Sequence, residues 1–163
     1  MLAMNLVKKE PAQESYVADK LDERILRELS RNARDSFREI ARRLKVSTST
    51  VVQRVKRLES EGIINGYSPL LNHARLGYEF TGLIEVTIRK GALLEVQRQI
   101  SNLPGVVAVY DVTGLSDSMV LVRARNRGEF SKIVKQILSL DQVERSNTHV
   151  ILNVIKEEYR QLL

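Results

Sequence analysis

The chain has 163 residues, of which 43% are hydrophobic and 28% charged, and its formal net charge is +6, a composition typical of a soluble protein with one domain or two small ones. The absence of cysteine excludes disulfides and cysteine-based metal sites, and two histidines are too few for a histidine cluster in one chain, so we expect no metal site. No apolar run approaches the roughly 18 residues that span a bilayer, and the N-terminal segment lacks the apolar core of a signal peptide, so we expect a cytoplasmic protein without membrane contact.

The positive charge is concentrated near the N-terminus. Residues 20–66 contain twelve Lys and Arg but only seven Asp and Glu, which accounts for nearly all of the excess. A basic domain beside a nearly neutral one indicates a polyanionic partner for the first domain. A solvated surface without a partner would carry the same charge, so this inference needs a motif.

Residues 1–17 are polar and lack periodicity, which predicts an N-terminal arm. Residues 18–62 are predicted to form a three-helix domain. In its first helix, within residues 19–34, the apolar residues at helical spacing are Leu21, Ile25, Leu26 and Leu29.

Residues 36–62 are predicted to form two helices joined by a tight turn. Ser36 and Glu39 have the spacing of a capping box, Ser47 is the expected cap of the following helix, and Gly62 is expected to end it. The inward side chains are predicted to be Phe37, Ile40, Ala41 and Leu44 in the first helix, and Val51, Val55 and Leu58 in the second.

The outward side chains of the second of these helices suit DNA. Short hydroxyls, an amide and a methyl group match base edges in the major groove, while Lys, Arg and free helical amides match phosphates. The candidate DNA-binding residues are Ser47, Thr48, Ser49, Val52, Gln53, Arg54, Lys56 and Arg57. Three-helix domains also bind proteins, which remains an alternative.

Residues 63–78 are predicted to be a hinge, because Gly, Pro and Asn interrupt short apolar pairs there. Residues 79–163 then contain a repeat with an offset of 37, in which Leu83 corresponds to Val120 and Leu103 to Leu140. Two successive β-α-β units predict a βαββαβ ferredoxin-like (ACT-like) domain, with a four-stranded antiparallel sheet and both helices on one face. The whole chain is therefore expected to be α+β, with an N-terminal winged-type helix-turn-helix.

The last strand is predicted within residues 148–155. Alternation places Thr148, Val150, Leu152 and Val154 on one face and Ile151 and Ile155 on the other, together with His149 and Asn153. In the preceding strand Met119 and Leu121 oppose Val120 and Val122, so both sheet faces are expected to be largely apolar. The helices cover only one face. The other is expected to pack against a second copy in a two-fold homodimer, which implies a pseudo-palindromic double-stranded DNA site.

The segments DKLDERIL, SFREIARRLKVSTSTVVQRVKRLESEGIINGY and HARLG resemble the N-terminal domain of the Lrp/AsnC (feast/famine) transcription regulators. The family pattern is met at Asp19, Asp22, Ile25, Leu26, Ala41, Ser47, Arg54, Val55, Leu58, Glu59, Gly62, Ile63 and Ile64. One departure is Lys45, at a turn where such proteins often have Gly, and a positive φ there would cost about 1 kcal/mol. The resemblance implies further assembly into a tetramer or octamer and a C-terminal domain that senses an amino acid.

The same resemblance implies an effector site at a Gly-x-x-Asp loop between the two central strands. Its candidate residues are Thr113, Gly114, Leu115, Ser116 and Asp117, together with Thr148. A carboxylate and exposed amides match the ammonium and carboxylate of an amino acid. The alternative is a tight hairpin in which Asp117 binds its own backbone.

Catalysis is not indicated. The sequence has no phosphate-binding Gly-rich loop, nucleophile elbow or metal-spaced cluster, so we expect neither an enzyme nor a cofactor beyond the small-molecule effector. The predicted function is a DNA-binding, amino-acid-sensing transcription regulator, nucleoid-associated in the cytoplasm. Two alternatives remain: an effector-independent, chromatin-like DNA organiser, and a metabolite-sensing module that binds protein.

Overall fold

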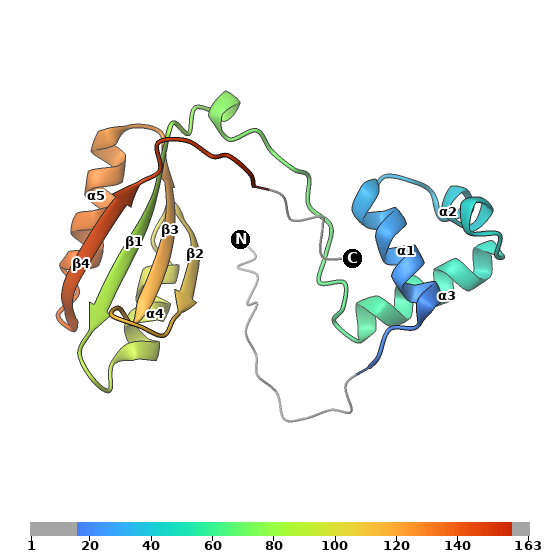
Figure 1. Cartoon of the computed structure of the whole chain (residues 1–163), viewed down its shortest axis with the longest axis horizontal. Helices are drawn as coiled ribbons and strands as arrows, with labels where there is room; N and C mark the ends of the chain where they lie inside the picture. The colour runs from blue at the N-terminus through green and yellow to red at the C-terminus, as the bar shows by residue number, and fades with distance from the viewer. Residues whose placement is uncertain (1–15, 158–163) are drawn as a thin grey trace. The chain divides into compact units, whose positions relative to one another are not determined.

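A computed structural model describes residues 16–157 of the chain (Figure 1). The chain divides into two units, one ending at Pro69 and the other comprising Leu70–Glu157. The boundary between them lies inside the segment predicted as a hinge. Most of the arm predicted for residues 1–17 lies outside the described residues, as do the last residues of the predicted 79–163 domain.

The first unit consists of α1 (Lys20–Arg31), α2 (Phe37–Leu44) and α3 (Thr48–Ser60). Asp19 and Asp22 form a capping box at the start of α1, and Ser36 and Glu39 form the one predicted for α2. The buried core of this unit is Ile25, Leu26, Leu29, Ile40, Ala41, Leu44, Val51, Val55 and Leu58. Every predicted inward position is in this core except Phe37, which is 37% exposed. The prediction for Phe37 was wrong, because a residue in the first turn of a helix can extend past the edge of the packing surface.

The turn from α2 to α3 contains a left-handed residue. Lys45 has φ 57° and ψ 44°, and among the described residues it is the one non-glycine with positive φ. The expected strain is therefore present, at about 1 kcal/mol. Gly62, with φ 68°, ends α3 as predicted: its amide donates to Glu59 O (3.1 Å) and the Ile63 amide donates to Leu58 O (2.9 Å).

The second unit begins with the 3₁₀ turn η1 (Ala74–Leu76) and then has the order β1 (Phe80–Ile88), α4 (Leu93–Ser101), β2 (Val106–Asp111), β3 (Ser118–Ala124), α5 (Arg127–Leu138) and β4 (Val143–Val150). The antiparallel sheet has the strand order β2-β3-β1-β4. This arrangement confirms the predicted α+β class and the βαββαβ order.

One face of this sheet packs on α4 and α5, which lie behind the sheet in Figure 1. The buried residues between them include Ile84, Val86, Val120 and Val122 from the sheet and Val96, Ile100, Phe130, Ile133 and Ile137 from the helices. Gly82 permits this packing, because a Cβ built there would lie 2.3 Å from the ring of Phe130.

The predicted extent of the last strand was wrong. β4 ends at Val150, and residues 151–157 belong to no strand, although the Ile151 amide still donates to Thr81 O (2.9 Å). Apolar alternation predicted a strand through Ile155, but a strand also needs a partner. Here β1 pairs with residues 143–150 of β4, except for Glu144, which lies at an irregularity in the register.

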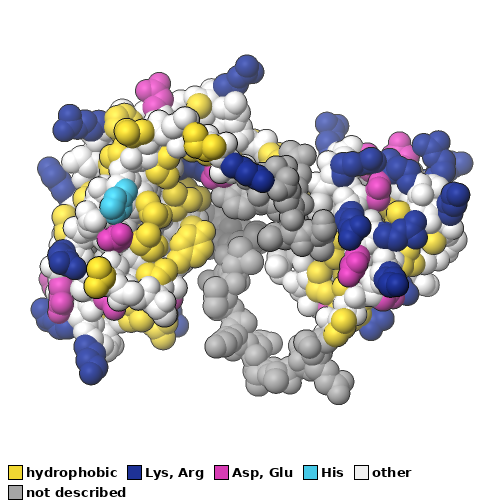
Figure 2. Space-filling model, viewed as in Figure 1, with side chains coloured by type: hydrophobic (Ala, Val, Ile, Leu, Met, Phe, Trp, Pro, Cys, Tyr) yellow, Lys and Arg dark blue, Asp and Glu magenta, His cyan; other side chains and the backbone are white. Residues whose placement is uncertain are grey.

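The other face of the sheet is called the open face below, because neither α4 nor α5 packs on it. The pairing register places Leu83, Ala108, Tyr110, Met119 and Leu121 on this face. Figure 2, in the same view, shows hydrophobic side chains gathered over the sheet. The β4 positions on this face are the polar residues Arg145, Asn147 and His149. The open face therefore carries an apolar group contributed by β1, β2 and β3, as expected, but the same register also places the polar residues Thr81, Glu85, Thr87 and Arg123 on it. The expectation of a largely apolar face was wrong for β4.

Candidate DNA interface and effector loop

The exposed side of α3 carries most of the candidate DNA-binding residues. Thr48, Ser49, Gln53, Lys56 and Arg57 are exposed, and Val52 is half-buried beside them. Within the described part of the chain, Gln53 and Lys56 make no side-chain hydrogen bond or ion pair. These polar groups are therefore available to an external partner.

Ser47 has a local role at the start of this helix. Its hydroxyl accepts from the Thr50 amide (3.0 Å) and lies 2.7 Å from the Ser49 hydroxyl and 2.8 Å from that of Thr50. The amides of Thr48 and Ser49 have no acceptor within the helix, because they belong to its first turn. The start of α3 thus offers hydroxyls and free amides, which suit both base edges and phosphate oxygens.

Arg54, by contrast, is bound inside the domain. Its guanidinium forms ion pairs with Asp19 and with Asp22, the latter at 3.2 Å, and the Asp22 side chain is fully buried. The hydrogen bond with Asp19 is the main reason why the pKa of Arg54 is raised. The structure therefore gives this guanidinium two partners at the start of α1, the N-cap residue Asp19 and Asp22. Below, the exposed row of α3 denotes its exposed polar candidates Thr48, Ser49, Gln53, Lys56 and Arg57.

The carboxylate of Asp22 also has several partners. It accepts from the Asp19 amide (3.1 Å) and from the hydroxyl of Tyr16. Tyr16 and the two aspartates are functional candidates that the DNA-binding prediction missed. The paired acids in DKLDE were a signal for Asp19 and Asp22, but nothing in the sequence pointed to Tyr16.

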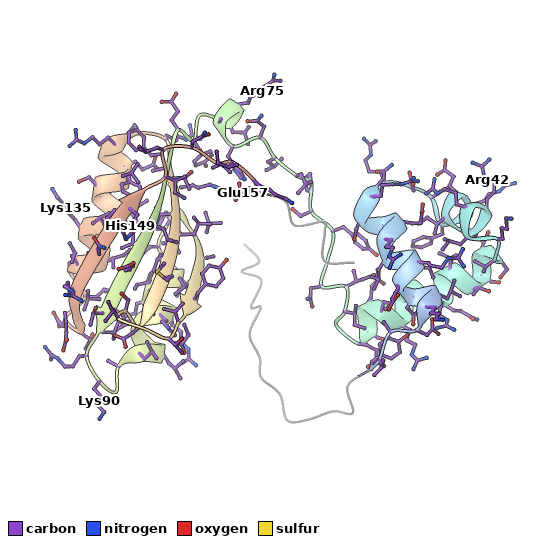
Figure 3. All side chains as sticks on the ribbon, in the orientation of Figure 1. Arg42, Arg75, Lys90, Lys135, His149 and Glu157 are labelled. Carbon is purple, nitrogen blue, oxygen red and sulfur yellow. The ribbon has the colours of Figure 1, made fainter. Side chains whose placement is uncertain are left out.

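Some of the Lys and Arg side chains of residues 20–66 are paired within the unit. Arg43 forms ion pairs with Asp35 and, at 2.5 Å, with Glu28. Arg42 on α2 is exposed (Figure 3), and Figure 2 shows further Lys and Arg side chains over this unit. Arg43 is therefore engaged in ion pairs within the unit, whereas Arg42 is not among the paired cations of the described residues.

The predicted effector loop, Thr113–Asp117, joins β2 to β3. Its Asp117 is bound to β1: the carboxylate accepts from the Ile88 amide (2.7 Å), and the Asp117 amide donates to Val86 O (3.0 Å). The alternative, in which this side chain bonds its own hairpin, is not what the structure shows, because its partner is on β1. One carboxylate oxygen is thus committed to the strand backbone.

The other loop residues differ in their surroundings. Leu115 is 94% exposed, Gly114 has φ 128°, and the Ser116 hydroxyl lies 3.4 Å from Glu85 Oε2 on β1. Thr148 lies on β4 opposite Ile84. Because β1 lies between β4 and β3, the structure does not bring Thr148 together with the loop within one chain.

A polar cluster beside the loop was missed by sequence reasoning. Glu85 lies 3.3 Å from the Nε2 atom of His149 and 3.4 Å from the amide of Asn147, all on the open face (Figure 3). The three residues come from β1 and β4, which are far apart in sequence, so no local pattern could group them. Through Ser116 the cluster connects the loop to the open face.

A groove of about 860 Å³ lies elsewhere in the second unit, between residues 71–79 and residues 151–157. Leu71, Leu121 and Ile155 supply apolar lining, and Arg123 supplies a charge. The sequence prediction missed this groove because it assigned residues 151–155 to a strand.

Neither a metal site nor a membrane span is found in residues 16–157. No three His, Asp or Glu side chains of this part gather in a way that could hold a metal ion. None of its helices is both long and apolar enough to cross a bilayer.

Two family models match the chain: an AsnC-type helix-turn-helix domain over residues 19–59 and an Lrp/AsnC ligand binding domain over residues 81–161. An uncharacterized HTH-type transcriptional regulator of Pyrococcus furiosus is 42% identical over 142 residues, which cover 87% of this chain and 96% of the relative. The HTH-type transcriptional regulator Ptr1 of Methanocaldococcus jannaschii is 33% identical over 140 residues, covering 85% and 95%.

Solved structures are similar over the same extent. AsnC of E. coli superposes with a TM-score of 0.82 at 25% identity, covering 88% of this chain and 97% of that one. A transcriptional regulator of Neisseria meningitidis in complex with L-Met gives a TM-score of 0.82 at 28% identity, covering 88% and 96%. The similarity therefore includes both units.

Proposed function

Because the chain belongs to the Lrp/AsnC family, and so is a transcriptional regulator with a DNA-binding helix-turn-helix domain and a ligand-binding domain, we propose a mechanism for its two domains. A homodimer, further assembled into a tetramer or octamer, binds a pseudo-palindromic DNA site. An amino acid or related small metabolite bound at the C-terminal domains changes its affinity for that site. The protein acts in the cytoplasm, on the nucleoid.

The observation that carries the DNA-binding proposal is the exposed row on α3. Gln53 and Thr48 offer an exposed amide and an exposed hydroxyl without a side-chain partner in the described residues, and the exposed Ser49 hydroxyl bonds only that of Ser47. Lys56 and Arg57 follow on the same side of the helix. In the proposed complex α3 enters the major groove, the first group contacts base edges, and the second contacts phosphates.

The open face of the sheet supports the dimer proposal. Leu83, Met119, Leu121 and Tyr110 form an apolar surface that the helices of the same chain leave uncovered. Burial of about 25 cal/mol per Å² of apolar area favours covering it with an identical face from a second copy. Such a two-fold dimer holds two α3 helices at one separation, with residues 63–78 acting as hinges.

The effector proposal rests on the loop Thr113–Asp117 and on the ligand-binding domain match. The carboxylate oxygen of Asp117 that does not bind Ile88 is available to an ammonium group, and the Neisseria regulator is described in complex with L-Met. Through Ser116 the loop contacts Glu85 on the open face. A ligand at the loop would thereby act on the dimer contact and on the separation of the α3 helices.

One observation favours the alternative of an effector-independent DNA organiser. Since Asp117 serves the β1 backbone, a structural role explains that residue without any ligand. The alternative of a protein-binding module instead rests on the general use of three-helix domains. It predicts binding that depends little on salt, whereas phosphate contacts release counterions.

The test is selection of bound duplexes from a random DNA pool, repeated with and without each of the twenty amino acids. We expect an enriched pseudo-palindrome whose binding weakens steeply with salt and changes with one class of amino acid. Enrichment unaffected by any amino acid would support the organiser instead. A pool without enrichment, together with a flat salt response, would overturn the DNA-binding proposal.

A further inference from the structure

Tyr16 lies just before α1, outside the segment that the helix-turn-helix family model matches. Its ring is half-buried and packs against the core of the first unit. Its hydroxyl donates to the carboxylate of Asp22, which is fully buried and also bound by Arg54. Tyr16 is therefore held both by packing on the core and by the hydrogen bond of its hydroxyl.

The ring of this anchored tyrosine stacks against Arg57 of α3. The guanidinium carbon of Arg57 lies 4.4 Å from the centre of the Tyr16 ring. Arg57 is exposed, and its side chain forms no ion pair or hydrogen bond with any other described residue. It thus differs from Arg54, three residues earlier on the same helix, whose guanidinium is neutralised by two aspartates.

A stack of this kind restrains an arginine without using its hydrogen bonds. The cation lies over the face of the ring, while the five N–H groups lie in the guanidinium plane and stay available to an acceptor. A free arginine loses much rotamer freedom when it binds a phosphate, and a restrained one has already lost part of it. The restrained Arg57 is therefore expected to bind an anion held at a fixed position beside α3 with a smaller loss of entropy than a free arginine would.

We propose that Tyr16 is a positioning residue for DNA binding, which holds Arg57 ready for a backbone phosphate. Asp22, itself bound by Arg54, holds Tyr16 in place through a hydrogen bond. The ring of Tyr16 in turn restrains Arg57. The proposal rests on the DNA-binding function proposed above and deepens it. It adds a residue from the segment before the three-helix domain to the interface, although that residue itself need not touch DNA.

Four full-length variants test this proposal on the duplex selected from the random pool. Tyr16→Leu removes the aromatic face, Tyr16→Phe keeps the face but removes the hydroxyl, Arg57→Ala removes the cation, and the fourth combines Tyr16→Leu with Arg57→Ala. We expect Tyr16→Leu to weaken binding about two- to fivefold, which corresponds to an exposed cation–π contact. We expect Tyr16→Phe to weaken binding less than Tyr16→Leu, because its ring still packs on the core but loses the hydrogen bond to Asp22.

Two readouts separate positioning from a general loss of structure. In the Arg57→Ala background, Tyr16→Leu should have no further effect on affinity, since the residue on which it acts is gone. The slope of log affinity against log salt should shift in Tyr16→Leu toward the Arg57→Ala value, which is itself reduced by about 0.9 for each lost phosphate contact and so by about 1.8 for the dimer. A change in folding stability alone would not produce either result.

Three outcomes would overturn the proposal. Tyr16→Leu could weaken binding equally with and without Arg57, it could tighten binding by releasing a sequestered arginine, or it could leave affinity unchanged while Arg57→Ala weakens binding. In each case the unmodified protein still binds DNA, so the proposed function stands. If the unmodified protein does not bind the duplex at all, the proposed function itself fails.

Discussion

The guanidinium of Arg54 on α3 donates to both carboxylate oxygens of Asp22 on α1, at 3.2 Å each, and Asp22 is fully buried. This pair joins α3 to the start of α1. The two arginines of α3 therefore differ: Arg54 is paired with a buried carboxylate, whereas Arg57, one turn further along, has no carboxylate partner in the described structure. Two residues of one type on one helix are thus expected to respond differently to mutation.

We expect Arg54→Ala to lower the free energy of unfolding by about 2 kcal/mol, because it leaves the buried Asp22 carboxylate without its cation. The matched control, Arg57→Ala, should change stability by less than about 0.5 kcal/mol but reduce the salt slope of DNA binding. Urea unfolding and DNA titration at several salt concentrations measure the two effects. An unchanged stability with a reduced salt slope for Arg54→Ala would show that Arg54 contacts phosphate instead.

Base preference should depend on Gln53. A side-chain amide that binds a base edge contributes about 1–3 kcal/mol of discrimination, so Gln53→Ala should relax the selected sequence at one position in each half-site. Lys56→Ala is the control, expected to weaken all duplexes by a similar factor. Selection from a random pool with each variant measures both. If the two variants gave the same selected sequence as the unmodified chain, the assignment of Gln53 to a base would be wrong.

Two substitutions at Asp117 separate its structural role from a ligand-binding role. Asn at this position can still accept the hydrogen bond from the Ile88 amide but carries no charge. Ala can neither accept this hydrogen bond nor carry a charge. We expect Asp117→Ala to lower stability by about 1 kcal/mol, and Asp117→Asn to retain stability while losing any rise in melting temperature caused by an amino acid. An intact ligand-induced rise in Asp117→Asn would mean that the carboxylate charge is not used for the ammonium group.

The open face should determine the oligomeric state. Met119 lies on this face of β3, between Glu85 of β1 and Tyr110 of β2, so Met119→Glu places a charge in the proposed dimer contact and should convert the dimer to a monomer. Leu94→Glu is the control, because Leu94 is 66% exposed on α4, on the other side of the sheet. Light scattering on both variants at low micromolar concentration gives the mass. A Met119→Glu protein that stays dimeric would place the two-fold contact elsewhere.

The capping box of α2 should make stability depend on acidic pH. The Ser36 amide donates to the Glu39 carboxylate (2.8 Å), and this bond is the main reason why the pKa of Glu39 lies below its ordinary value of 4.5. A lowered pKa in the folded state means that the contribution is complete above pH 4.5 and is lost as the pH falls through the lowered value. We therefore expect Glu39→Gln, which still caps, to lose less stability between pH 5 and pH 3 than the unmodified chain. Melting curves at both pH values test this, and equal losses would contradict it.

The helices of the first unit were predictable because their signals are local. The Ser36–Glu39 capping box, the Ser47 cap and the Gly62 terminus involve residues a few positions apart, and each is present in the structure. The repeat with an offset of 37 residues predicted the βαββαβ order because its signals are also local. Each half shows the same succession of a strand pattern, a helix pattern and a second strand pattern. The exposed row of α3 followed from removing the core positions.

The sequence by itself determined the elements, their order and the residues that point outward on α3, because caps, periodicities and repeats act over short separations. Only the tertiary structure decided that Arg54 pairs with Asp22, that Asp117 binds the Ile88 amide, and that β4 stops at Val150. It also decided that Tyr16 stacks on Arg57. These four results depend on which distant segments meet, and residues separated by tens of positions meet only once the helices pack and the strands adopt one register.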